Sequence, residues 1–186
     1  IVIMLYLKSF CFNPFQQNTY LIFNDEGNAF IIDPGNSNSS ENNVLKQFIE
    51  EKQIKPTRLL LTHAHIDHSG NVPNLIKQGF SGRIFCSGPT LELSGYLLQD
   101  SLNIQMMEVR KKRKVYFRNK KKKMAKGGVP EALYNKTHIE DFVEMSHALS
   151  SGAVFDYSDD LKLEFFPSGH ILGAISVKIS ALENGE

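Results

Sequence analysis

The chain has 186 residues, 41% of them hydrophobic, and a formal net charge of +1. This length is enough for one domain with a substantial core. No apolar run approaches the roughly 20 residues that a bilayer-spanning helix needs, so we expect no membrane contact.

The first third of the chain has strand-like runs separated by turn-forming residues. Strands are predicted over residues 1–10, 18–23, 29–33 and 58–61. Asp25–Asn28 contains glycine and asparagine, which predicts a hairpin turn between the second and third strands. Apolar residues recur at helical spacing from residue 41 to 53, and Ser39 or Ser40 is expected to cap that helix.

The rest of the chain continues the alternation of helices and strands. Helices are predicted over residues 72–78, 89–109 and 141–149. Strands are predicted over residues 83–86, 154–155, 161–166 and 174–180. Residues 110–130 read as a loop or as a helix with broken ends. Alternating strands and helices predict a layered α/β domain.

Two cysteines, Cys11 and Cys86, lie in apolar, strand-like surroundings. We expect reduced core thiols in a cytoplasmic protein rather than a disulfide. Neither cysteine has a spacing that suggests metal binding.

One stretch, Thr62–Ser69, places three histidines and an aspartate directly after an apolar strand. Neutral imidazole and carboxylate are ligands that suit zinc and its neighbours. His63 and His65 can converge on one ion, and Asp67 with His68 can reach a second. The alternative is a surface tract or a tag, but this cluster is internal and spaced.

This His-x-His-x-Asp-His spacing resembles that of the metallo-β-lactamase superfamily. Residues 62–101 are similar to the β-CASP branch, which includes ribonuclease J and the cleavage-and-polyadenylation nucleases. Residues 166–174 resemble the Gly-His-x-Leu-Gly segment of that family, and the long separation of His63 from His170 also suits β-CASP proteins. Residues 8–20 and 31–35 are more similar to glyoxalase II-like hydrolases.

The resemblance implies an α/β fold, the αββα sandwich of that superfamily, of which this chain holds only the N-terminal portion. It implies two zinc ions, one bound by His63, His65 and His170 and the other by Asp67 and His68. Asp67 and His65 would be catalytic, with Asp67 orienting the nucleophile.

Asp33 follows a strand and has two possible roles. By the resemblance, it would support the ligand loop through hydrogen bonds. It could equally be a turn-capping aspartate before Pro34 and Gly35.

We expect residues 1–186 to be an incomplete metallo-β-lactamase domain, the N-terminal piece of a larger protein. Asn184–Gly185 predicts a hairpin, and the family strand expected after it would end in an aspartate that bridges the two metals. The alternative is a short protein with a mononuclear or decayed site.

Residues 110–126 contain 11 of the 21 basic residues and no acidic residue. Such a block is either a solvated segment or a polyanion-binding arm. The candidate RNA contacts are Arg110, Lys111, Lys112, Arg113, Lys114, Lys120, Lys121, Lys122 and Lys123.

The leading hypothesis is a zinc-dependent ribonuclease that hydrolyses phosphodiester bonds in RNA. One alternative is a glyoxalase II-like thioester hydrolase. The other is an inactive fragment that binds nucleic acid through its basic segment.

Overall fold

Strands and helices alternate through most of the chain, as its pattern predicts. The structure is a computed structural model that describes residues 4–121, 127–150, 152, 154–158 and 161–181. Its elements are β1 (Leu5–Phe12), β2 (Gln17–Asn24), β3 (Asn28–Ile32), α1 (Ser39–Glu51), β4 (Lys55–Leu60), α2 (Ile66–Ser69), α3 (Val72–Lys77), β5 (Arg83–Ser87), α4 (Gly88–Lys121), α5 (Lys136–Met145), β6 (Ser146–Leu149), β7 (Val154–Ser158), β8 (Leu161–Pro167) and β9 (Ile175–Ala181).

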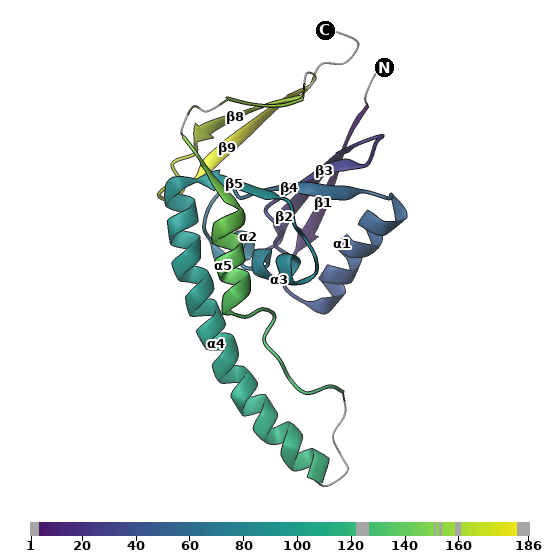
Figure 1. The fold of residues 1–186 in the computed structure, drawn as a ribbon, viewed down its shortest axis with the longest axis vertical. Helices are drawn as coiled ribbons and strands as arrows, with labels where there is room; N and C mark the ends of the chain where they lie inside the picture. The colour runs from purple at the N-terminus through teal and green to yellow at the C-terminus, as the bar shows by residue number, and fades with distance from the viewer. Residues whose placement is uncertain (1–3, 122–126, 151, 153, 159–160, 182–186) are drawn as a thin grey trace.

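The strands form two sheets (Figure 1). The larger has the order β1-β2-β3-β4-β5-β6, antiparallel through β3 and parallel from β3 to β6. The smaller is the antiparallel sheet β7-β8-β9. The predicted hairpin turn at Asp25–Asn28 is confirmed, with Gly27 at a φ of +78°. The parallel pairing of β3 with β4 requires a crossover, which α1 provides.

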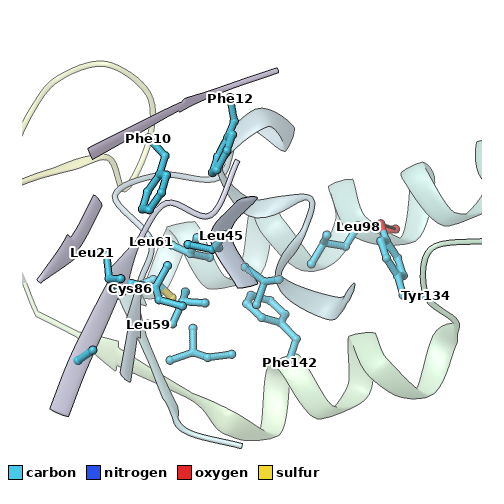
Figure 2. Packing of buried hydrophobic residues seen from close by; sticks show 14 of the residues in the cluster. Phe10, Phe12, Leu21, Leu45, Leu59, Leu61, Cys86, Leu98, Tyr134 and Phe142 are labelled. Carbon is cyan, nitrogen blue, oxygen red and sulfur yellow. Dashed lines mark hydrogen bonds between the residues drawn. The ribbon is translucent and has the colours of Figure 1, made fainter. Parts of the chain in front are cut away.

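Two apolar clusters divide the described part of the molecule into a helical layer, the large sheet and the small sheet. The first lies between the large sheet and the helices and includes Leu59, Leu98 and Phe142 (Figure 2). The second lies between the two sheets and includes Leu60, Phe85 and Phe165. Successive residues Leu59 and Leu60 therefore face different layers, as strand alternation requires.

Helix α4 is anchored along only part of its length. Its buried residues repeat on one face: Thr90, Ser94, Leu98, Leu102 and Val109. From Arg110 to Lys121 every side chain is exposed or half-buried, and this part of the helix extends beyond the other elements (Figure 1). Of the two alternatives predicted for the segment after Val109, a loop or a helix, the structure has a helix as far as Lys121, because lysine and arginine are good helix formers.

Three local predictions are wrong. Asn38 caps α1, through its side chain and the Glu41 amide 3.0 Å away, instead of Ser39 or Ser40. Residues 146–149, predicted as helix, form β6 and pair with β5, so sheet pairing overrides their helical spacing. Cys86 is buried, but Cys11 is exposed because it faces away from the core between Phe10 and Phe12.

None of the described helices has the length and apolar character that crossing a bilayer requires.

Candidate metal centre

Three histidines from distant parts of the sequence lie together at the end of β4. His63 and His65 belong to the histidine loop (residues 62–68), and His170 belongs to the β8–β9 loop (residues 168–174). The backbone amide of Ile175 donates to the carbonyl of Thr62 at 2.9 Å. This hydrogen bond joins the first residue of β9 to the histidine loop and brings the two loops side by side.

The three imidazoles face a common point. One ligand atom from each ring lies within 4.8 Å of the others. The ring centroids are 4.9 Å apart for His63–His65 and His63–His170, and 5.0 Å apart for His65–His170. His170 Nε2 is 3.3 Å from His65 Nδ1. Tetrahedral zinc with ligands at 2.0–2.1 Å separates neighbouring nitrogens by about 3.3–3.4 Å, so the His65–His170 pair has the spacing that this ion requires, and three imidazoles are ligands that suit it.

A hydroxyl fixes the orientation of the His63 ring. Thr62 Oγ1 donates to Asp33 Oδ2 at 2.5 Å, which leaves its lone pair to accept from His63 Nδ1 at 2.9 Å. We therefore assign the proton of His63 to Nδ1, and Nε2 carries the free lone pair that a metal needs.

His63 stays neutral over a wide pH range. Burial, together with the nearby charge of His68, lowers its pKa to about 4. Only the neutral ring can bind a metal. The ring that is most buried in the cluster is thus already in its binding form at neutral pH.

Asp33 holds the histidine loop in place through hydrogen bonds. It is buried, and its carboxylate accepts from the Thr62 amide at 2.8 Å, from the Thr62 hydroxyl and from His68 Nδ1 at 3.0 Å. Its φ of +48° is in the left-handed region, where a residue other than glycine costs about 1–3 kcal/mol. Thr19 Oγ1 at 2.7 Å and Gln17 Nε2 at 2.9 Å donate to its carbonyl and keep it there.

His68 lies between two carboxylates. Its Nδ1 is 3.0 Å from Asp33 Oδ2, and its Nε2 is 3.5 Å from Asp67 Oδ2. Burial acts to lower its pKa, but the hydrogen bond that His68 donates to Asp33 and the charges of Asp33 and Asp67 raise it overall.

A second group of candidate metal ligands contains Asp33, His63 and His68. Both oxygens of Asp33 already accept hydrogen bonds, so we assign this residue a supporting role. Asp67 and His68 are positioned to share an ion, but no third histidine or acid among the described residues completes a cluster with them.

Several residues that shape the site carry no signal in the sequence. Thr62, Gln17 and Thr19 act through hydrogen bonds to Asp33, and nothing in their spacing indicates this. The remaining histidines lie apart from the metal cluster: His138 caps α5, and His147 is exposed on β6.

The basic residues occupy the protruding part of α4. Of the predicted RNA contacts, the residues from Arg110 to Lys114 with Lys120 and Lys121 lie on this helix, while Lys122 and Lys123 are outside the described residues. A helix rises 1.5 Å per residue, so Arg110 lies about 33 Å along the axis from the start of α4. The structure does not bring the described part of the basic segment, Arg110 to Lys121, into contact with the histidines.

Comparison with known proteins identifies the class. The sequence profile of the Metallo-beta-lactamase superfamily matches residues 12–143, and the chain belongs to this superfamily. The resemblance of the histidine motif and the predicted fold class are confirmed. A curated relative, Transcription termination factor FttA of Lokiarchaeum sp. (strain GC14_75), is 33% identical over 121 residues. That match covers 65% of this chain, which spans only 16% of the length of FttA.

Two solved structures share the fold. The BLEG-1 B3 metallo-beta-lactamase has a TM-score of 0.53 and 20% identity, with 92% of this chain and 66% of that one covered. TTHA1623 in a di-iron-bound form has a TM-score of 0.52, 19% identity and the same coverage. At these identities the similarity establishes the fold.

Proposed function

We propose that this chain is the metal-binding part of a zinc-dependent hydrolase that cleaves phosphodiester bonds in RNA, in the manner of the β-CASP branch. The observation that carries the proposal is the convergence of His63, His65 and His170 on one point. The similarity to a transcription termination factor favours RNA over a thioester as the substrate.

Each residue has a defined task in this proposal. His63, His65 and His170 would hold zinc in their neutral forms, and the ion would supply hydroxide near neutral pH and stabilise charge on a phosphoryl oxygen. Thr62 and Asp33 keep the His63 ring oriented, and burial keeps it neutral. Asp67 is partly exposed beside the cluster, where its carboxylate can orient the proton of the attacking nucleophile. His68 and Asp67 would hold the second ion.

The exposed end of α4 would bind the RNA backbone. Eight of the residues from Arg110 to Lys121 are basic, and polyanion affinity arises largely from such neutralising contacts. Because the segment lies far from the histidines, it would anchor RNA and take no part in the chemistry.

A second candidate is RNA binding without hydrolysis. The observation that favours it is the Asp67–His68 pair, which has no third ligand among the described residues. This second candidate predicts that the chain binds zinc and binds RNA with salt-sensitive affinity, without cleaving the RNA.

The test is cleavage of end-labelled single-stranded RNA by the purified chain with added zinc or manganese. We expect the wild type and His147→Ala to cleave, because His147 lies outside the cluster, and His65→Ala to lose activity. Equal cleavage by His65→Ala would contradict the proposal. Binding without cleavage would establish the second candidate, and turnover of S-lactoylglutathione would establish thioester chemistry instead.

A further inference from the structure

The position of His170 is not fixed by packing of its own side chain. His170 is exposed, and so are its neighbours Ser168, Gly169 and Leu172. An exposed ring can be held at a metal only if the backbone that carries it is held. The contacts of the β8–β9 loop therefore decide whether the third histidine stays in place.

Two hydroxyls from another part of the fold bind the backbone of this loop. The carbonyl of Gly173 accepts from Ser87 Oγ at 2.6 Å and from Thr90 Oγ1 at 3.0 Å. A carbonyl oxygen has two lone pairs and each hydroxyl has one proton, so this arrangement uses the full donor capacity of both side chains. Ser87 Oγ in turn accepts from the Thr90 amide at 3.2 Å.

Burial makes these hydrogen bonds hard to replace. Ser87 is 7% exposed and Thr90 is fully buried. A buried hydroxyl or carbonyl that loses its hydrogen-bond partner keeps the cost of its desolvation without compensation. The loop cannot move from these hydroxyls without leaving polar groups unpaired.

Gly173 permits the close approach. Its φ is +81°, and a Cβ there would lie 2.6 Å from Ser87 Oγ and 2.8 Å from both Pro89 Cβ and the Thr90 nitrogen. Only glycine fits this conformation and this space without displacement. Two residues later, the amide of Ile175 binds Thr62 in the histidine loop. The segment after His170 is thus attached both to the start of α4 and to the loop that carries the other two histidines.

We propose that Ser87 and Thr90 are positioning residues, which hold the Gly173 carbonyl so that His170 completes the metal site with His63 and His65. This inference rests on the proposed metal site. Neither hydroxyl touches the metal position or the substrate; both act on affinity and coordination geometry through the backbone.

The test measures zinc affinity by chelator competition and coordination by the visible spectrum of the cobalt-loaded protein. We expect Ser87→Ala and Thr90→Val to weaken zinc binding about 10- to 100-fold, the range seen when supporting partners of ligands are removed. The cobalt spectrum should lose the intensity of a tetrahedral site as His170 withdraws. Thr90→Ser keeps the hydroxyl and should restore affinity to near that of the wild type.

Ser94→Ala is the matched control, since Ser94 is also a fully buried hydroxyl on α4 but has no hydrogen-bond partner. Unfolding in the presence of EDTA separates stability from metal binding. Unchanged zinc affinity and an unchanged cobalt spectrum in both variants would overturn the inference while leaving the metal site intact. Zinc binding that His65→Ala does not reduce would instead overturn the metal site, and the positioning role with it.

Discussion

At the scale of single residues, His63 has the features that a proposed metal ligand needs before a metal binds. Its ring is buried, its Nδ1 is bound to Thr62, and its pKa is lowered to about 4. The proton is thus absent from the nitrogen that must bind. Asp33 maintains the orientation of His63 by accepting a hydrogen bond from the Thr62 hydroxyl. The backbone of Asp33 is itself strained, because its φ is positive.

Removing the Thr62 hydroxyl should therefore weaken metal binding. Thr62→Val keeps the shape of the side chain but breaks the link between Asp33 and His63. We expect zinc affinity to fall about 10- to 100-fold. Thr57→Val, an exposed threonine in β4, is the control and should bind zinc normally in the same chelator titration.

The pKa of His63 also predicts a pH dependence for the metal-free protein. Between pH 6.5 and about 4, the His63 ring stays neutral in the folded state, whereas the same ring is protonated in the unfolded chain. Stability from this residue is complete above pH 6.5 and is lost as the pH falls.

Urea unfolding in EDTA at pH 7 and pH 4.5 measures this loss. His63→Gln should reduce the difference between the two pH values by up to about 3 kcal/mol, at 1.36 kcal/mol per pKa unit. His147→Gln, at an exposed position, should leave the difference unchanged. An equal loss in His63→Gln and wild type would show that His63 is not the group responsible.

At the scale of elements, α4 joins two environments. Its first six turns carry the buried stripe that ends at Val109, and its remainder carries only exposed or half-buried side chains rich in lysine. The first part belongs to the core, and the second is free to bind a polyanion. Arg113 Nε donates to the carbonyl of Pro130 at 2.7 Å, which ties the exposed half to the returning chain.

Neutralising the basic part of α4 should lower RNA affinity without disturbing the fold. Glutamine has a helix propensity close to that of lysine. The variant replaces five lysines with glutamine: Lys111, Lys112, Lys114, Lys120 and Lys121. If each contacts a phosphate, the slope of log affinity against log salt should fall by about 3.5, at 0.7 per contact.

The control replaces five exposed lysines elsewhere: Lys8, Lys46, Lys52, Lys55 and Lys77. It carries the same change in net charge, so an equal loss of RNA affinity in both variants would point to overall charge and against a binding role for α4. Filter binding at several salt concentrations gives both slopes.

Strands β1 and β5 place the two cysteines in opposite environments. Cys11 is exposed, whereas burial raises the pKa of Cys86 to about 12. Only the thiolate reacts with alkylating agents. Iodoacetamide at pH 8 should add one group to the native protein, at Cys11, and two in denaturant. Modification of Cys86 without unfolding, seen by peptide mass spectrometry, would contradict its burial.

At the scale of the whole molecule, the proposed metal site depends on how the two sheets pack. His63 and His65 follow the large sheet, whereas His170 follows β8 of the small sheet. The apolar layer between the sheets, with Leu60 and Phe165, sets their separation. A change in this layer should therefore reach the site from a distance.

Phe165→Ala tests this dependence. Phe165 is 2% exposed, and its truncation should destabilise the protein by about 3–5 kcal/mol. Zinc binding should weaken as well, because the small sheet would no longer hold His170 in a fixed position relative to the large sheet. The neighbouring Phe166 is 46% exposed, so Phe166→Ala should change neither property much. Full zinc affinity in a folded Phe165→Ala protein would refute the dependence of the site on sheet packing.

Much of the fold could be predicted because local patterns agree with it. The hairpin at Gly27, the alternation of strands and helices, and the β8 and β9 strands all follow from turn residues and periodicity. The strand at residues 146–149 could not be predicted from the sequence, because its pairing with β5 depends on a partner some 60 positions away. The full length of α4 could not be decided from the sequence, because a charged surface helix has no apolar period to follow.

The residues of the candidate site also fall into those that the sequence could predict and those that it could not. The three histidines could be chosen from the motif and from the second match at His170, and the structure brings them together. Their metal-binding role stays a prediction. The residues that hold them could not be found, since Thr62, Ser87 and Thr90 are ordinary hydroxyl residues whose importance lies in contacts across the fold.

The length of helix α4 fixes the distance between the histidines and the basic residues. Its first turn touches the loop of His170, and its 34 residues extend about 50 Å to the lysines at its far end. If α4 binds RNA as proposed, a short oligonucleotide would not reach both ends, whereas a longer one could bind at the tip of α4 while another part of it lies at the histidines. The fixed length of one helix would then set a minimum size for efficient substrates, with no contact to any base.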